Sequence, residues 1–180
     1  MTRSAATDTA ALGPPIHVLF LCTHNSARSI LAEATLNHLG GPRLRAFSAG
    51  SSPRESQQPH PMALQVLQRA GISTKGLRSK CWDEFAAPDA PPMDLIVTVC
   101  DNAAGEPCPV WPGHPATAHW GYADPSATEG TDAQRLDAFR QTLFALRRRL
   151  DQLVAMPSEH IDRLVLQRRA RALAFGPEAP

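Results

Sequence analysis

Cys22 opens a short polar run that has the composition of an anion-binding loop. It follows the apolar stretch 16–21, so it lies where a buried strand gives way to a helix. Backbone N–H groups in such a turn lack helical partners and point inward. The run therefore predicts a cradle for a tetrahedral oxyanion, with the thiol of Cys22 as its nucleophile. The predicted oxyanion-binding residues are Thr23, His24, Asn25, Ser26, Ala27, Arg28 and Ser29.

Two residues of this loop supply the charge and the hydrogen bond that thiol chemistry needs. Arg28 carries a planar guanidinium that suits two anionic oxygens at once. Because a guanidinium and a helix N-terminus stabilise a thiolate, the sequence predicts a lowered pKa for Cys22. Ser29 can add a hydroxyl donor to the sulfur. The alternative is a buried structural cysteine beside a solvated arginine. That alternative does not explain why Cys, Asn, Arg and Ser occur together at a junction between a strand and a helix.

A late aspartate is the candidate proton donor. A thiolate that attacks a phosphate ester needs an acid to protonate the departing oxygen. Asp124 precedes Pro125 in the loop after the predicted strand 116–120, and the proline restricts the backbone beside the acid. Taken alone, an Asp-Pro pair indicates an ordinary turn more often than catalysis.

Two further cysteines suit a redox relay. Cys100 lies at the end of the apolar strand 95–99, at the same sheet edge as Cys22, and Cys108 follows in a loop that contains Gly105. In such a relay Cys22 binds the oxyanion, Cys100 attacks the Cys22 sulfur and releases reduced product, and Cys108 then attacks Cys100. Cys81 is an extra thiol, predicted to be a small buried side chain rather than an alternative resolving cysteine.

Alternating strands and helices position these groups. This alternation predicts an α/β fold, a doubly wound, Rossmann-like sandwich whose central four-stranded parallel sheet binds ligands at its carboxyl edge. The C-terminal helical piece either packs back or mediates self-association, and the sequence leaves both open. The predicted strands cover 16–21, 44–48, 95–99 and 116–120. The predicted helices start near Ala27, at Pro59 or Pro61, at Asp132 and near Ser158, and they end near Gly40, Gly71, Leu153 and Leu173.

Composition limits the class of protein. The 180 residues, 43% of them hydrophobic, suit one domain with a substantial core, and a net charge of +1 gives no reason to expect nucleic acid. No apolar run is long enough to span a membrane. Residues 1–15 lack the apolar core of a signal peptide and are predicted to be a disordered lead, followed by a domain at 16–155 and a helical extension at 156–180. A cytoplasmic protein with reactive thiols is predicted.

The loop and the cysteines together resemble a known family. The pattern C-x5-R-S after the first strand resembles low-molecular-weight protein tyrosine phosphatases and the arsenate reductases that share their fold. The thioredoxin-coupled reductases are matched more closely, over roughly 16–154, by Thr98-Val99-Cys100-Asp101, Cys108-Pro109, His119-Trp120-Gly121 and Asp124-Pro125.

The resemblance implies arsenate reduction to arsenite in arsenic detoxification. It places the nucleophile at Cys22, the arginine at Arg28, the acid at Asp124, and the second and third redox cysteines at Cys100 and Cys108. It implies no bound cofactor but an external thiol reductant, which is thioredoxin or a small thiol such as glutathione or mycothiol with a glutaredoxin or mycoredoxin.

The sequence departs from the family pattern in three places, two of them in the loop. His24 replaces a common glycine, and Ala27 replaces a cysteine often found before the arginine. Some relatives bind potassium with positions that resemble Asn25, Glu33 and Ser48. Lys80 replaces their acidic ligand, and its ammonium could substitute for the ion, so no metal is predicted.

Three other functions compete with a reductase. A phosphatase would use Cys22, Arg28 and Asp124, but Tyr122 is the only tyrosine, whereas phosphotyrosine sites tend to have aromatic entrances. An oxyanion sensor would bind without turnover. A structural zinc site is disfavoured because seven residues separate its first two cysteines. Its ligands would be Cys100, Cys108, His114 and His119.

Overall fold

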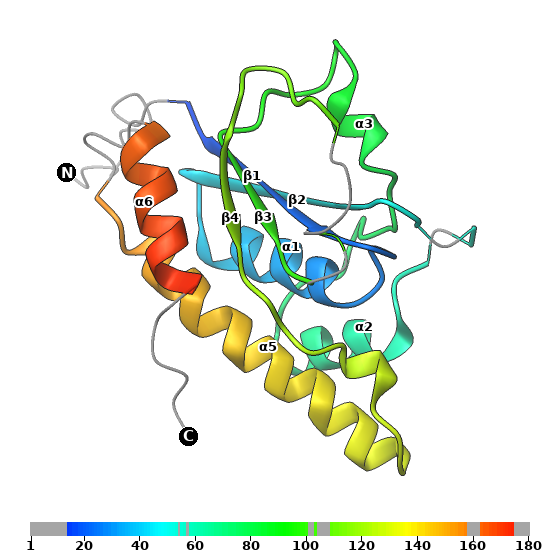
Figure 1. Ribbon diagram of the computed structural model, residues 1–180. Helices are drawn as coiled ribbons and strands as arrows, with labels where there is room; N and C mark the ends of the chain where they lie inside the picture. Colours follow the sequence, from blue (N-terminus) through cyan, green and yellow to red (C-terminus); the bar gives the residue numbers. More distant parts are fainter. Residues whose placement is uncertain are drawn as a thin grey trace, which may run out of the picture.

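Four parallel strands form the centre of the protein, as the computed structural model in Figure 1 shows. Their order in the sheet is β2-β1-β3-β4, so β1 has a neighbour on each side. All three strand pairs are parallel, which confirms the predicted fold class. The strands are β1 (Ile16–Cys22), β2 (Leu44–Gly50), β3 (Leu95–Thr98) and β4 (Ala116–His119).

The structure describes residues 14–53, 55–56, 58–100, 103, 109–157 and 163–174, and within α6 it describes the side chains from 166 onward. The predicted relay cysteine Cys108 lies outside the described residues. So do residues 1–13 of the predicted lead 1–15. No helix in the described part of the chain combines the length and the apolar composition of a membrane span.

The sheet buries a continuous apolar stretch of β1 at its centre. Val18, Leu19, Phe20 and Leu21 of β1 have no exposed surface, as expected for a parallel strand covered on both faces. The register pairs the last residue of β1, Cys22, with Gly50 at the end of β2. The carboxyl ends of the central strands therefore meet at one edge, where parallel sheets bind ligands.

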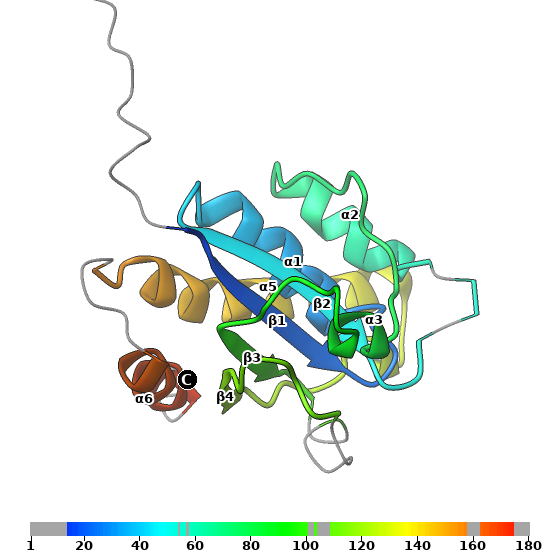
Figure 2. The same ribbon diagram turned by 90° about the horizontal axis from the view of Figure 1, so that it is seen from above.

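The two faces of the sheet are covered differently. Three helices lie together on one side of the strands (Figure 2), where they pack into the larger apolar core. The opposite face holds a smaller core, in which Phe85 of the short helix α3 (Asp83–Ala86) contacts the Leu19 and Leu21 side of β1. The three helices are α1 (Arg28–Leu39), α2 (Pro61–Arg69) and α5 (Asp132–Val154).

The C-terminal helix α6 (Arg163–Ala174) packs on its own domain, beside β4 (Figure 1). The indole Nε1 of the fully buried Trp120 donates a hydrogen bond to the carbonyl oxygen of Ala170 at 2.8 Å. Nε of Arg171 donates to the carbonyl oxygen of Thr117 at 3.2 Å. Of the two arrangements that the sequence leaves open, the structure has α6 packed against the sheet.

Candidate active site

The loop between β1 and α1 has the form of an anion cradle. α1 begins at Arg28, and its cap residue Ala27 has only a methyl side chain, which cannot accept a hydrogen bond from the N–H groups of the first turn. The first turn of α1 contains no acidic side chain either. The N–H groups and the positive end of the helix dipole therefore have no competing anion from the first turn, which suits an oxyanion ligand.

Asn25 fastens this loop from inside. Its backbone has a φ of 48°, in the left-handed region that asparagine tolerates better than most residues. Its side-chain amide donates to the hydroxyls of Ser29 and Ser48, each at 2.8 Å. Its Oδ1 accepts the backbone N–H of Lys80 at 2.7 Å, so the buried Asn25 joins the loop to β2 and to the segment before α3.

Cys22 is deeply buried at the base of the loop. It is 3% exposed, and its Sγ lies 2.9 Å from the hydroxyl oxygen of Ser29, as the sequence predicts. Burial raises the pKa of the Cys22 thiol above its ordinary value, although the hydrogen bond with Ser29 and the charge of Arg28 act in the opposite direction. The predicted lowering of this pKa is therefore wrong, because loss of water outweighs the favourable field.

Arg28 is held by the loop that carries the candidate acid. Its guanidinium donates to the carbonyl oxygen of Tyr122 at 2.9 Å and lies 3.3 Å from the carboxylate of Asp124. The backbone N–H and the hydroxyl of Ser126 both donate to the other oxygen of that carboxylate, at 3.0 and 2.7 Å. The structure thus brings together Arg28 and Asp124, which are 96 positions apart in the sequence.

These contacts determine how Asp124 titrates. Burial raises the pKa of Asp124, but the hydrogen bonds from Ser126 and the charge of Arg28 outweigh burial and hold it below the ordinary value. The carboxyl is therefore ionised at neutral pH while it pairs with Arg28. To act as an acid, Asp124 must therefore first lose its pairing with Arg28 and take up a proton, which it can then give to the departing oxygen of a substrate.

A second thiol lies beside the loop. Cys100 follows β3 and is 1% exposed. Its Sγ lies 3.7 Å from the hydroxyl oxygen of Thr23 and accepts the backbone N–H of Ala103 at 3.4 Å. Cys100 is also close enough to act on Cys22 electrostatically. It raises the pKa of the Cys22 thiol, although less than burial does. Cys22 and Cys100 thus occupy the same edge of the sheet.

Lys80 lies in a buried ion pair behind the loop. Its ammonium lies 3.2 Å from a carboxylate oxygen of Glu33 and donates to the carbonyl oxygen of Arg78 at 3.0 Å. The same oxygen of Glu33 accepts a hydrogen bond from Ser48, whose hydroxyl also accepts from Asn25. The ammonium is thus linked to the cradle through Glu33, Ser48 and Asn25.

Gly50 is a site residue that the sequence analysis misses. It forms the end of β2, and a side chain there would collide with the loop backbone. A Cβ atom at Gly50 would lie 2.9 Å from the nitrogen of Asn25 and 3.0 Å from the carbonyl oxygen of Cys22, and closer still to the carbonyl oxygen of Thr23. The signal in the sequence is a glycine after a predicted strand, which also suits an ordinary turn.

Gly50→Ala is expected to destabilise the protein and displace the loop. The cost expected for such overpacking is about 1–3 kcal/mol. Phosphate affinity should fall as well, because the displaced groups are the backbone of the cradle. Chemical unfolding and phosphate titration of the variant check both effects. Gly76→Ala is the control for backbone strain without a collision, because its φ is 79° and an added Cβ would meet no atom within 4 Å; it should lose stability but keep phosphate affinity. Unchanged phosphate affinity in Gly50→Ala would contradict this assignment.

Cys81 is half-buried, so its prediction as a buried side chain is wrong. The residue forms an isolated parallel bridge with Gly50 beyond the edge of the sheet, and its Sγ lies 3.5 Å from a carboxylate oxygen of Asp83. The prediction rests on the general tendency of free cysteine to be buried, whereas a position beyond the sheet edge leaves the Cys81 side chain partly in solvent.

Cys81→Ser is expected to keep turnover within about twofold of the unchanged chain, because serine retains a hydrogen bond to Asp83 at a partly exposed position. Steady-state kinetics with the full reducing system checks this result. A loss of multiple turnover would instead make Cys81 a resolving cysteine.

A parallel sheet with a buried cysteine loop, an arginine at the helix start and an opposing Asp124 defines an enzyme of the thiol-dependent, oxyanion-binding class. The chain matches the family described as "Low molecular weight phosphotyrosine protein phosphatase" over residues 17–165. It belongs to this family.

Similar proteins include arsenate reductases. The chain is 33% identical over 124 residues to the arsenate reductase of Bacillus subtilis (strain 168), which covers 69% of this chain and 84% of the relative. The crystal structure of arsenate reductase from Archaeoglobus fulgidus DSM 4304 has 29% identity and a TM-score of 0.60, over 77% of this chain and 99% of that one. A thioredoxin-dependent arsenate reductase of Corynebacterium glutamicum has 25% identity and a TM-score of 0.53, over 81% and 67%.

Proposed function

We propose that this protein reduces arsenate to arsenite with electrons from a thioredoxin-like dithiol. The observation that carries the proposal is the second buried thiol: Sγ of Cys100 lies 3.7 Å from Thr23 Oγ1 of the cradle. A phosphatase needs one thiol and water, whereas a reductase must pass two electrons onward. The relatives named as arsenate reductases support the same activity.

The first step forms an arsenic–sulfur bond. Cys22 first gives its proton to an oxygen of the hydrogen arsenate ion, and the resulting thiolate then attacks arsenic(V) while that oxygen leaves as water. The thiol of Cys22 is buried with a raised pKa, so it meets the anion in its neutral form and its proton passes to an arsenate oxygen. Arg28 and the loop N–H groups hold the remaining oxygens. Once the anion competes for Arg28, the carboxyl of Asp124 becomes available to the leaving oxygen.

The next steps move the two electrons outward. The thiolate of Cys100 attacks the sulfur of Cys22, and the electron pair of the arsenic–sulfur bond stays on arsenic, which leaves as arsenite. The resulting Cys22–Cys100 disulfide is attacked by Cys108, which regenerates the Cys22 thiol and leaves a Cys100–Cys108 disulfide. An external dithiol reduces that disulfide, so the enzyme needs no bound cofactor. A thiol relay of this kind suits the reducing cytoplasm, where we place the reaction.

The phosphatase alternative is less well supported by the surroundings of Tyr122. The only tyrosine of the chain uses its carbonyl oxygen to hold Arg28, and the guanidinium of Arg149 lies 4.8 Å from its ring centre. The ring is therefore engaged with α5 and does not serve as a platform for a phosphotyrosine substrate.

The experiment follows NADPH oxidation by the purified chain with thioredoxin, thioredoxin reductase and arsenate, beside hydrolysis of an aryl phosphate. Arsenate-dependent oxidation that is lost in Cys100→Ser supports the reductase. Cys108→Ser should release about one arsenite per protein and then stop as a Cys22–Cys100 disulfide. Hydrolysis of the aryl phosphate without arsenate-dependent oxidation, also after small thiols replace thioredoxin, would overturn the proposal.

A further inference from the structure

A groove between α2 and α5 lies outside the proposed active site. Its volume is about 340 Å³, within the range of pockets that take small organic molecules. It is built from the second half of α2 and the first two thirds of α5, whereas the oxyanion loop lies at the start of α1. Its apolar lining includes Val66, Ala70, Ile72, Leu136, Leu143 and Phe144.

Three arginines surround this apolar lining. Arg69, Arg140 and Arg147 line the groove together with one acid, Asp137, which leaves an excess of two positive charges (three minus one). Arg140 pairs with Asp137 at 2.5 Å, and Arg147 reaches Asp151 only at 3.9 Å. No ion pair joins Arg69 to any of the acidic residues that the structure describes. The groove is therefore complementary to an anion.

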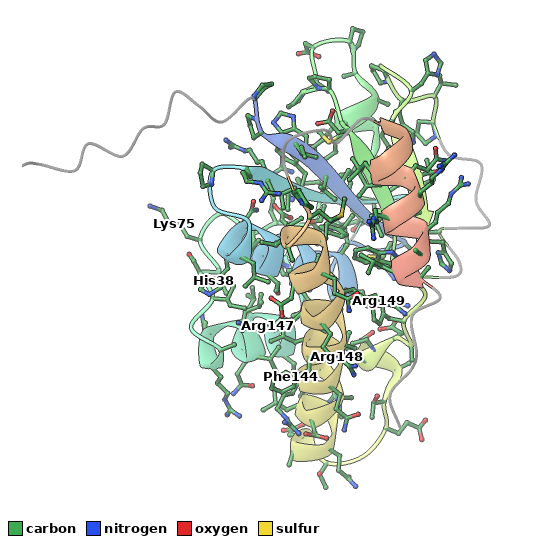
Figure 3. All side chains as sticks on the ribbon, turned by 90° about the vertical axis from the view of Figure 1, so that its left-hand side faces the viewer. His38, Lys75, Phe144, Arg147, Arg148 and Arg149 are labelled. Carbon is green, nitrogen blue, oxygen red and sulfur yellow. The ribbon has the colours of Figure 1, made fainter. Side chains whose placement is uncertain are left out.

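Phe144 gives the groove an unusually exposed apolar wall. Its side chain is 54% exposed, and the guanidinium of Arg140 lies 5.6 Å from its ring centre. Figure 3 views α5 from its outer side, with Phe144 and Arg147 labelled on the helix and α2 beside it. Covering this ring removes apolar surface from water, which favours a ligand with an apolar body.

We propose that this groove binds a small amphiphilic anion, with an alkyl or aryl body on the apolar lining and one carboxylate or sulfonate group against the arginines. The pocket volume favours a small molecule over a docked helix, and the charge excess favours an anion over a neutral lipid. The site is separate from the cradle of Cys22, so the proposal does not depend on arsenate reduction.

The test is a fluorescence titration of the full chain with 8-anilinonaphthalene-1-sulfonate, a probe with an aromatic body and one sulfonate. Saturable binding of one probe per chain is expected, and decanoate should displace it much better than decanol does. The double variant Arg69→Gln/Arg147→Gln should weaken binding about fivefold to tenfold, because these arginines carry the charge excess of the groove and each exposed or partly exposed charge contributes modestly. Ala70→Trp should abolish binding by filling the groove.

Arg148→Gln is the matched control, since this exposed arginine lies next to Arg147 but does not line the groove (Figure 3). It should bind the probe like the unchanged chain. Non-saturable binding, equal affinity in all variants, or equal displacement by decanol and decanoate would each overturn the proposal. So would displacement by inorganic phosphate, which would place the probe in the Cys22 cradle. Circular dichroism of each variant excludes probe binding to an unfolded chain.

Discussion

Cys22→Ser is expected to reduce arsenate turnover by about a thousandfold or more, the scale seen when a nucleophile is removed from a catalytic group that acts as a unit. Serine fits the buried position and keeps a hydrogen bond to Ser29, so the fold should be retained. The hydroxyl, however, is a far poorer nucleophile toward arsenic and cannot enter a disulfide. Arsenite production with excess reductant measures the loss.

The matched control for this result is Cys81→Ser, which removes a thiol outside the cradle. Phosphate binding by Cys22→Ser should remain, because Arg28 and the loop N–H groups are unchanged. Arsenite production above about a tenth of the original rate in Cys22→Ser would remove Cys22 from its proposed role.

The raised pKa of Cys22 adds a pH dependence. Below that pKa the thiol is mostly protonated, so the rate of alkylation by iodoacetamide should rise with pH beyond the range where an ordinary thiol levels off. The folded chain also holds this proton more tightly than the unfolded chain. This contribution to stability is thus present at low pH and is lost as the pH rises through the folded pKa.

Lys80→Met is expected to lower the free energy of unfolding by about 3–5 kcal/mol, because it leaves the carboxylate of Glu33 buried without its ionic partner. The side chains of Lys80 and Glu33 are only 8% and 12% exposed, so solvent cannot replace the lost ammonium. Urea unfolding followed by circular dichroism measures the change. Phosphate affinity should fall with it, since Glu33 supports the loop through Ser48 and Asn25.

Two companion variants separate the ion pair from general effects of the substitution. Lys75→Met removes an exposed lysine nearby in the sequence and should change stability by less than about 0.5 kcal/mol. Lys80→Met/Glu33→Gln removes both charges and should recover much of the lost stability. A double variant as unstable as the sum of its single changes would show that the pair has no energetic coupling.

The positions of Cys22 and Asp124 can be predicted from the sequence because they depend on local sequence patterns. The run before Cys22 is apolar at every position except His17, and Asp124 precedes a proline after a predicted strand, so both could be placed at the carboxyl edge without tertiary information. The strand at 95–98 is similarly unambiguous. The structure confirms these elements and the parallel sheet that they form.

What the sequence could not supply depends on burial and on contacts over long separations. The pKa of Cys22 is decided by loss of water, which a charge pattern in the loop does not reveal. The role of Gly50 depends on an approach within 3 Å by a loop that lies 25 or more positions earlier. The partial exposure of Cys81 follows from its place beyond the sheet edge, which no local pattern specifies.

The packing of α6 on β4 affects whether the edge of the sheet can pair with another protein molecule. In β4 the N–H groups of Ala116 and Trp120 bond toward β3, so the carbonyl oxygen of Thr117 between them points to the outer side of the last strand. Arg171 of α6 bonds to that oxygen, and Trp120 anchors the same helix. An uncovered outer strand is a template on which a foreign strand can add and aggregation can begin. By covering the outer edge of β4, α6 therefore blocks the addition of a further strand to that side of the sheet.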